Sequence, residues 1–411
     1  MGKWKECTIG DIGTVVGGAT PSTKKIENYE NGTISWITPK DLSNFSGRYI
    51  SRGERNITEM GLKSCSAQFM PKNTVLFTSR APIGYVAIAE NEVCTNQGFK
   101  SVVPNENTDF LFLYYLLKYN KDNIENMGSG TTFKEVSGKT MREIGVRVPE
   151  RIEEQRKIAE ILGTIDDKIE ENEKINKNLE QQMQSIFKAR FIDVPLSSTW
   201  KNGTFSEIVD STLGGDWGKE TPTGNYTEHV YCMRGADIPE IKAGNKGKMP
   251  TRYILPKNYA NKALTPGDVV VEISGGSPTQ STGRVAAVSQ SLLDRYDQGI
   301  VCTNFCRAMK PKNGYSMFLY FYWQYLYDRN VFFLYENGTT GIKNLDLNGF
   351  LSTEKIRIPS FDEVCEFEDI CHKYFDKIFN NGSENEKLSS LRDYLMPQLM
   401  SGEIDVSDIE L

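Results

Sequence analysis

The chain has 411 residues, of which 38% are hydrophobic and 25% are charged, a composition typical of soluble globular proteins. This length exceeds one ordinary hydrophobic core, so two or more domains are expected. The sequence has no run of about 18 apolar residues to span a bilayer, and its start lacks the apolar core of a secretory signal, so we expect a cytoplasmic protein without membrane contact.

The formal net charge of −6 is concentrated in two short segments. Residues 149–197 carry −3 and residues 359–411 carry −9, whereas residues 1–148 and 198–358 each carry +3. Because a locally basic face binds phosphate whatever the total charge, the two larger segments are compatible with nucleic-acid binding.

Cysteine and histidine are arranged unlike the ligands of a structural metal. The eight cysteines are scattered without a C-x-x-C pair, and only two histidines are present, His229 and His372. Zinc fingers and ribbons need tighter paired spacings. We therefore expect reduced, mostly buried thiols and no metal.

Along the first 148 residues, short alternating apolar stretches separated by Gly and Pro turns predict strands. An aromatic-rich helix is predicted at 110–119, with its apolar stripe facing the core. A Gly-Thr-Thr loop and a strand ending at Pro149 follow. The earlier strands are predicted at Ile9–Val16, Thr74–Phe77, Tyr85–Ala89 and Lys100–Val103.

The stretch "GSGTTFKEVSGKT", residues 128–140, ends in the letters that close a phosphate-binding loop. A P-loop needs a glycine five residues before Gly138, where Phe133 stands, and it should follow a buried strand rather than a helix. The ATPase interpretation therefore fails. We expect the loop threonines to cap the next helix or, as the weaker alternative, to contact phosphate; these are Thr131, Thr132 and their later counterparts Thr339 and Thr340.

The residues after Pro149 predict a long helix with a heptad seam, because apolar or amide residues recur at alternating steps of four and three. The seam spans about 43 Å at 1.5 Å per residue. Its residues are Ile158, Leu162, Ile165, Ile169, Asn172, Asn176, Leu179, Met183 and Ile186.

The whole order of parts is then repeated. "CTNQGFKSVVP" at 94–104 returns as "CTNFCRAMKP" at 302–311, and "GTT" at 130–132 returns at 338–340, both shifted by 208 residues. A second aromatic helix occupies 315–335. A period this long indicates tandem duplication of a domain rather than a solenoid.

A shift of 209 places a second seam in the C-terminal segment, with asparagines again at two buried positions. Buried asparagines fix register and partner, so we predict that the two helices pack antiparallel and that their asparagines meet. The alternative is two independent amphipathic helices, each on its own globule. Gly382 weakens the second helix, and Pro397 should kink or end it. This seam consists of Cys371, Tyr374, Ile378, Asn381, Asn385, Leu388 and Leu395, with Arg392 between the last two.

The predicted fold is therefore α+β, with two similar mixed α/β globules separated by two long antiparallel coiled-coil helices in a pseudo-twofold tandem duplication. The predicted boundaries are 1–148 for the first globule, 149–197 for the first long helix, 198–358 for the second globule and 359–411 for the second long helix and tail.

Several phrases carry a family resemblance: "GGATPSTK", "ISWITPKDL", "TSRAPIGYVAIA", "TNQGF" and "GSGTTFKEVSGKTMREIGVRVPERIEEQRKIAEIL", followed by "IDDKIEENEKINKNLEQQ". In these phrases, and in their looser second copy, the chain resembles the specificity (S) subunits of type I restriction-modification systems. The resemblance implies two target-recognition domains that each read half of a bipartite DNA site, and helices that set the gap between the halves. It also implies methyltransferase subunits docked on the helices, restriction subunits joining that complex, and no cofactor.

The resemblance also implies a non-catalytic subunit, and the residues agree. The chain has no Pro-Pro for an adenine methyltransferase motif. The nearest nuclease-like acids, Asp268 and Glu272, lack the following lysine. The two histidines have no nucleophile suggested by spacing. A fused restriction-methylation enzyme is therefore disfavoured, and a stand-alone DNA-binding or scaffold protein is the alternative.

Direct readout needs Arg, Lys, Asn or Gln at base edges, and positioning needs Lys, Ser or Thr at phosphates. Residues of these types in or beside Gly/Pro-rich loops are the candidate DNA contacts. In the first copy they are Lys24, Lys25, Lys40, Thr78, Ser79, Arg80, Gln97 and Lys134. In the second they are Lys219, Arg234, Ser274, Gln280, Ser281, Arg284 and Lys343. The start of the second copy, "LGGDWGKETPTGN", departs from the pattern, as expected if the two domains read different bases.

Overall fold

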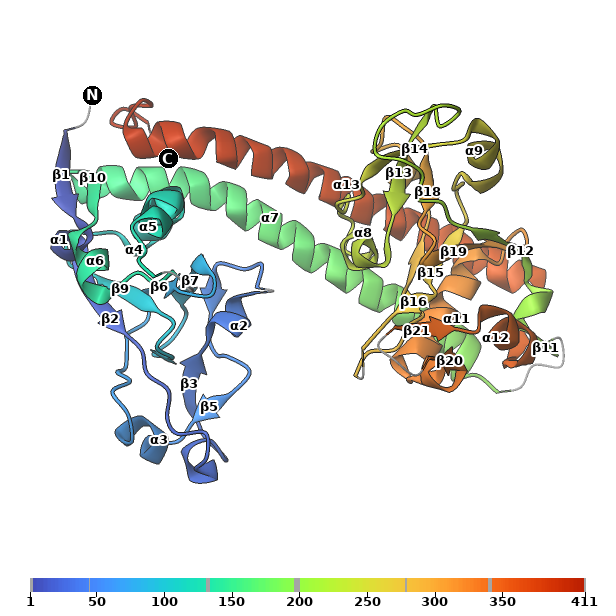
Figure 1. Cartoon of the computed structure of the whole chain (residues 1–411), viewed down its shortest axis with the longest axis horizontal. Helices are drawn as coiled ribbons and strands as arrows, with labels where there is room; N and C mark the ends of the chain where they lie inside the picture. The colour runs from blue at the N-terminus through green and yellow to red at the C-terminus, as the bar shows by residue number, and fades with distance from the viewer. Residues whose placement is uncertain are drawn as a thin grey trace. The chain divides into compact units, whose positions relative to one another are not determined.

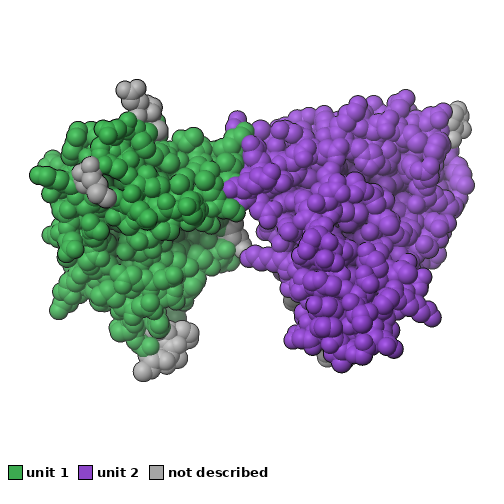
Figure 2. Space-filling model, turned by 90° about the horizontal axis from the view of Figure 1, so that it is seen from above, with its two compact units in different colours: residues 1–170, 388–411 green, residues 171–387 purple. Residues whose placement is uncertain are grey.

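The computed structural model describes residues 3–43, 45–130, 134–195, 200–277, 279–338 and 342–409. The chain forms two compact units, one of residues 1–170 with 388–411 and the other of residues 171–387 (Figure 1; Figure 2). Each unit holds one globular domain and parts of two long helices. The four threonines expected to cap helices, Thr131, Thr132, Thr339 and Thr340, lie outside the described residues.

The first and last strands of the first domain pair with each other. Strand β1 (Trp4–Thr8) pairs antiparallel with β10 (Gly145–Pro149). The main sheet has the order β2-β9-β6-β7-β4, and a smaller sheet has the order β5-β3-β8. The strands are β2 (Gly13–Gly17), β3 (Ile34–Ile37), β4 (Tyr49–Ile50), β5 (Asn56–Ile57), β6 (Val75–Ser79), β7 (Ile83–Ala89), β8 (Cys94–Thr95) and β9 (Lys100–Pro104). The helices are α1 (Ile9–Ile12), α2 (Pro39–Ser43), α3 (Glu59–Lys63), α4 (Phe110–Tyr119), α5 (Lys121–Asn126) and α6 (Gly138–Glu143), with a 3₁₀ turn at Ile26–Asn28.

The second domain repeats this plan. Strand β11 (Lys201–Thr204) pairs antiparallel with β22 (Lys355–Ile358). The main sheet has the order β12-β19-β15-β17, the smaller sheet β14-β13-β18, and an additional sheet β16-β21-β20. The other strands are β12 (Val209–Gly214), β13 (Glu228–Met233), β14 (Thr251–Ile254), β15 (Val269–Glu272), β16 (Ser274–Gly275), β17 (Val285–Ala287), β18 (Ile300–Cys302), β19 (Cys306–Pro311), β20 (Glu336–Asn337) and β21 (Lys343–Leu345). The helices are α8 (Ile238–Lys242), α9 (Pro256–Lys262), α10 (Gln290–Leu293), α11 (Ser316–Asp328) and α12 (Leu347–Thr353), with 3₁₀ turns at Phe205–Glu207, Gly235–Asp237 and Val331–Tyr335.

The strand predicted at Ile9–Val16 is wrong in its first half. Residues Ile9–Ile12 form α1, and strand β2 begins only at Gly13. The Asp11 carboxylate accepts hydrogen bonds from both the backbone N–H and the hydroxyl of Thr8, at 2.7 Å each. This capping box starts a helical turn, which local apolar alternation alone does not reveal.

The aromatic helices are core elements, as predicted. In α4, Phe112 and Tyr115 are fully buried, and in α11 Phe318 and Trp323 are fully buried. The two helices begin differently. The Asp109 carboxylate caps α4 by accepting from the N–H groups of Leu111 and Phe112, whereas the N-terminal turn of α11 is capped from outside.

That outside cap is Glu368, a buried residue of the long helix α13 (Phe361–Ser401). Its carboxyl group accepts a hydrogen bond from the backbone N–H of Met317, at the start of α11. Burial raises the pKa of Glu368 to about 7, although the helix N–H groups favour its charged form. Glu368 therefore joins α13 to the core of the second domain.

Helix α7 (Ile152–Phe187) and α13 bury their predicted seams, and a π-helical turn (Lys188–Ile192) continues α7. The fully or nearly fully buried seam residues are Ile158, Leu162, Asn172, Asn176, Met183, Cys371, Ile378, Asn381 and Asn385. Those that are partly exposed are Ile165, Ile169, Leu179, Ile186, Tyr374, Leu388, Arg392 and Leu395.

The asparagines of α7 and α13 meet in the second unit. Asn172 Nδ2 donates to Asn385 Oδ1 at 2.9 Å, and Asn381 Nδ2 donates to Asn176 Oδ1 at 2.8 Å. The earlier residue of one helix contacts the later residue of the other, so the helices run antiparallel. These contacts exclude two independent helices.

Gly382 and Pro397, expected to weaken and to kink or end the second helix, both lie inside α13. Helix α13 continues to Ser401, so it does not end at Pro397, and the alternative of a kink there stays a prediction. At Gly382, an added Cβ would collide with the carbonyl oxygen of Gly244, in the loop after α8. The glycine that lowers helix propensity thus allows the second domain to pack closely against α13.

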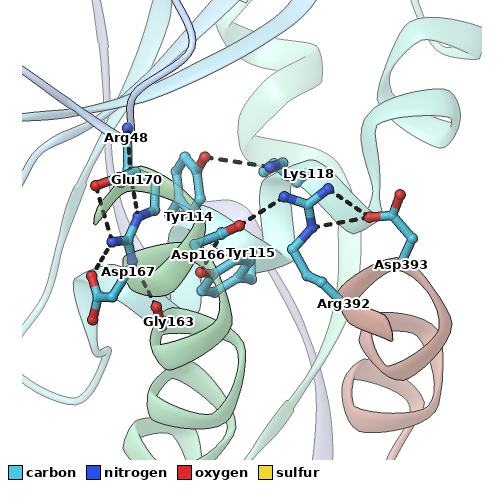
Figure 3. A network of polar contacts seen from close by, with 10 residues as sticks. All are labelled: Arg48, Tyr114, Tyr115, Lys118, Gly163, Asp166, Asp167, Glu170, Arg392 and Asp393. Carbon is cyan, nitrogen blue, oxygen red and sulfur yellow. Dashed lines mark hydrogen bonds and ion pairs between the residues drawn. The ribbon is translucent and has the colours of Figure 1, made fainter. Parts of the chain in front are cut away.

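A buried polar network joins the first domain to α7 and α13 (Figure 3). Arg48, whose side chain is 4% exposed, pairs with Asp167 and, at 2.8 Å, with Glu170 of α7. One residue before Asp167, Asp166 accepts from the Tyr115 hydroxyl and from Arg392 of α13, each at 2.7 Å. One helix turn of α7 thus contacts the first domain and α13 through ionic groups.

The α+β fold class with two similar mixed domains and two long antiparallel helices is confirmed. All eight cysteines are free thiols, and five of them are buried. No helix in the described ranges is both long and apolar enough to cross a membrane.

Candidate nucleic-acid interface

In each domain, a tight turn joins a strand of the small sheet to a strand of the main sheet, β8 to β9 in the first domain and β18 to β19 in the second. In the first domain, the N–H of Asn96 bonds to the Ile37 carbonyl at 3.0 Å, and that of Ser79 to the Gly98 carbonyl at 2.7 Å. In the second, the N–H of Thr303 bonds to the Met233 carbonyl at 2.9 Å, and that of Ile273 to the Phe305 carbonyl at 2.9 Å. We call residues Asn96–Phe99 and Thr303–Cys306 the reading turns.

A Gly-Gly segment at the end of β2 or β12 packs directly behind each reading turn. The N–H of Ala19 bonds to the Thr95 carbonyl at 3.0 Å, and that of Asp216 to the Cys302 carbonyl at 2.8 Å. A Cβ on Gly18 or Gly215 would collide with the backbone of the turn. The glycines therefore permit the close approach that holds both turns in one conformation.

These hydrogen bonds correct the register of the repeat. The sequence match of Cys-Thr-Asn at 94 and 302 implies a shift of 208 residues. The backbone contacts pair Asn96 with Thr303 and, at the strand, Lys100 with Arg307, which is a shift of 207. The Cys-Thr-Asn match is therefore one residue out of register.

The corrected register identifies residues that the sequence comparison missed. Gln97 corresponds to Asn304, so each reading turn exposes an amide side chain. Gly98, which is buried, corresponds to Phe305, which is 59% exposed. The prolines that end the paired strands, Pro104 and Pro311, already differ by 207, and this spacing was the signal that could have revealed Asn304.

Side chains around the reading turns differ although the backbones agree. In the first domain, the Thr20 hydroxyl donates to the Gln97 side-chain oxygen. The counterpart of Thr20 in the second domain is Trp217, which is 40% exposed. The Arg252 guanidinium lies 4.2 Å from the centroid of the Trp217 ring. The first site is thus polar and the second is aromatic and cationic.

The candidate contacts fall into three groups by exposure. Those at the surface are Lys24, Lys25, Lys40, Gln97, Lys134, Lys219 and Gln280, of which Lys40 pairs with Glu54 at 2.7 Å. Those partly exposed and held by neighbours are Arg80 near Glu135, Arg234 on Asp237, Ser274 on Asn344 and Lys343 on Glu336.

The third group consists of four candidates whose side chains are buried or paired inside their own domain. Thr78 and Ser79 are fully buried at the end of β6, where their hydroxyls donate to the Pro82 and Gly98 carbonyls. Ser281 is also buried. Arg284 forms two hydrogen bonds to Glu272, at 2.6 and 2.7 Å, so its guanidinium is used inside the domain.

The acids that resembled part of a nuclease motif have structural partners. Asp268 pairs with Lys310 at 2.6 Å, and Glu272 is occupied by Arg284. His229 stacks on Tyr253 rather than facing a nucleophile. Within the part of the chain that the structure describes, no cluster of His, Cys, Asp or Glu is arranged to hold a metal ion.

Comparison with known proteins gives full-length similarity to one family. The family described as "Type I restriction modification DNA specificity domain" matches residues 1–181. The chain is 33% identical to the MjaIX specificity subunit of a type I restriction enzyme from Methanocaldococcus jannaschii, over 99% of this chain and 94% of that protein. It is 22% identical to the HindI specificity subunit of Haemophilus influenzae, over 98% of this chain and all of that protein.

The fold has a full-length counterpart among solved structures. The type I restriction-modification S subunit from M. genitalium superposes with a TM-score of 0.58 at 17% identity, covering 97% of this chain and 96% of the other. At this identity the likeness concerns the fold.

Proposed function

The chain belongs to the specificity subunits of type I restriction-modification systems, and we propose that its two domains read the two halves of a bipartite, asymmetric DNA sequence through their reading turns. As a DNA specificity subunit the chain is non-catalytic, and its family implies DNA and the other subunits of the restriction-modification complex as partners. The finer assignments below are part of the proposal.

The duplicated reading turn carries the proposal. A backbone arrangement kept in both domains, with different exposed side chains, provides one scaffold and two specificities. Exposed amides such as Gln97 and Asn304 can form paired hydrogen bonds with adenine in the major groove. Because equivalent positions of the two turns carry different side chains, we expect the two half-sites to differ, which makes the whole recognition sequence asymmetric.

The surface cations near these turns supply phosphate contacts rather than base recognition. Lys24 and Lys25 follow the first Gly-Gly segment, and Lys219 follows the second. Lys134 lies beside Glu135, which contacts both Arg80 and Lys100 at 3.5 Å. These side chains position each domain on the duplex.

The long helices have a different role in the proposal. Residues 149–197 and 359–411 carry net charges of −3 and −9, which disfavours contact with DNA. We assign them to set the gap between the half-sites and to dock methyltransferase subunits, with restriction subunits joining that complex.

Methylome sequencing of cells carrying the chain with its methyltransferase subunit tests this proposal. The expected modification is adenine methylation in a split, asymmetric sequence. The Gln97→Ala and Asn304→Ala variants should each relax one base position, and they should do so in different half-sites. A continuous or palindromic motif, or both variants acting on the same half-site, would contradict two unlike reading domains.

A further inference from the structure

Phe305 is a large apolar side chain held in the open at the centre of the second domain's reading turn. Its ring is 59% exposed, while its backbone is fixed. The Phe305 carbonyl accepts from the N–H groups of Ile273 and Ser274, at 2.9 and 3.2 Å, and the N–H of Cys306 bonds to the Thr303 carbonyl at 2.9 Å. An exposed aromatic ring on a rigid turn contributes nothing to the domain core.

The surroundings of Phe305 differ from those of its counterpart in a coordinated way. In the first domain, a Cβ on Gly98 would come within 2.8 Å of the Pro39 ring. In the second domain, the residue corresponding to Pro39 is Gly235, because the capping contacts Thr38–Asp41 and Arg234–Asp237 are equivalent. The proline-glycine pair of one domain is thus replaced by a glycine-phenylalanine pair, so the second domain has no proline ring at the position that would crowd a Cβ in the first domain.

The residue before Phe305 indicates which base pairs the turn could recognise. Asn304, which precedes Phe305 in the chain, also exposes its side chain. An amide that pairs with adenine and a ring that contacts a methyl group together suit the major groove of an A·T-containing step, where the C5-methyl of thymine is the apolar feature. A ring used as an intercalating wedge belongs instead to minor-groove binding, which an adjacent reading amide does not favour.

We propose that Phe305 is a specificity-determining residue that recognises a thymine in the second half-site by contact with its C5-methyl group. The inference rests on the proposed function, because it requires the reading turns to face DNA. It predicts that the second half-site contains a thymine whose methyl group contributes to binding.

The test uses the intact complex of this chain with its methyltransferase subunit and duplexes carrying the sequence found by methylome sequencing. Each thymine of the second half-site is replaced in turn by deoxyuridine, which removes only the methyl group. One replacement should weaken binding by the wild-type complex about four-fold, the value for one buried methyl-sized group. The Phe305→Ala complex should bind natural DNA more weakly and should be indifferent to that same replacement.

Leu334→Ala is the matched control, since Leu334 is 83% exposed in the same unit but lies outside the reading turn; it should keep the wild-type response. A second half-site without thymine, a wild-type complex insensitive to every replacement, or a Phe305→Ala complex that still responds would overturn the inference. Loss of affinity in Phe305→Ala with no methyl effect would indicate a wedge instead. If Gln97→Ala and Asn304→Ala also leave the motif unchanged, the proposed interface itself fails; if they change it, only the Phe305 assignment fails.

Discussion

At the scale of single residues, Glu368 shows how a carboxyl group can serve packing and still be sensitive to pH. It lies buried between α13 and the first turn of α11, where burial raises its pKa to about 7. Its protonated form is therefore favoured in the folded chain below about pH 7. The stability it contributes is complete below the ordinary glutamate pKa of about 4.5 and is lost as the pH rises through about 7.

We predict that Glu368→Gln removes this pH dependence. The amide oxygen can still accept from the Met317 N–H, but the variant carries no charge to bury. From pH 5 to pH 8, the wild type should lose up to about 3 kcal/mol of unfolding free energy relative to the variant, since one pKa unit corresponds to about 1.4 kcal/mol. Urea unfolding at both pH values measures the difference, and an equal difference at pH 5 and pH 8 would refute the assignment.

Other residues show where sequence comparison reaches its limit. Gln97 was predicted as a DNA contact from its residue type and loop position, but its counterpart Asn304 was not considered because the Cys-Thr-Asn letters align one position away. Backbone hydrogen bonds, not identical letters, define equivalence in diverged copies. Burial is a second property that the sequence did not reveal. Thr78 and Ser79, the last residues of β6, were predicted to be accessible, but both are fully buried.

At the scale of elements, the long helices were the most predictable part, because a heptad seam is a local pattern with a long run. The contact of Asn172 with Asn385 and of Asn176 with Asn381 follows from the same pattern. The parallel pairings of β3 with β8 and of β13 with β18 join segments distant in sequence, and nothing local predicts them. The attachment of Arg48 to α7 was unpredictable for the same reason.

The Arg48 network leads to a prediction about that attachment. Arg48→Ala removes a nearly buried cation and leaves Glu170, which is only 20% exposed, without its cationic partner, so it should destabilise the first domain by about 2–4 kcal/mol. Lys40→Ala breaks a pair whose side chains are 78% and 66% exposed, and it should cost less than about 1 kcal/mol. Urea unfolding of the two variants compares these costs. Similar small losses in both would show that the network contributes little.

At the scale of the whole molecule, duplication provides a structural basis for the two specificities that we propose. Each domain repeats the closing strand pair, the main sheet, the parallel-paired small sheet and the reading turn. The two copies differ at positions around the turns. Thr20 of the first domain corresponds to Trp217 of the second, and Gly98 corresponds to Phe305. Selection for a different half-site can therefore change these side chains without changing the backbone that presents them.

The same division of labour predicts the effect of changing helix length. A seven-residue insertion between Ile158 and Ile186, matched by one in α13, preserves the heptad phase and lengthens each helix by about 10 Å. If the helices set the gap, methylome sequencing should find the two half-sites unchanged and their separation increased by about three base pairs, at 3.4 Å per base pair. A three-residue insertion breaks the phase of the seam and should instead reduce methylation at every spacing. Changed half-site bases in the seven-residue variant would contradict this role, because the helices would then influence base recognition itself.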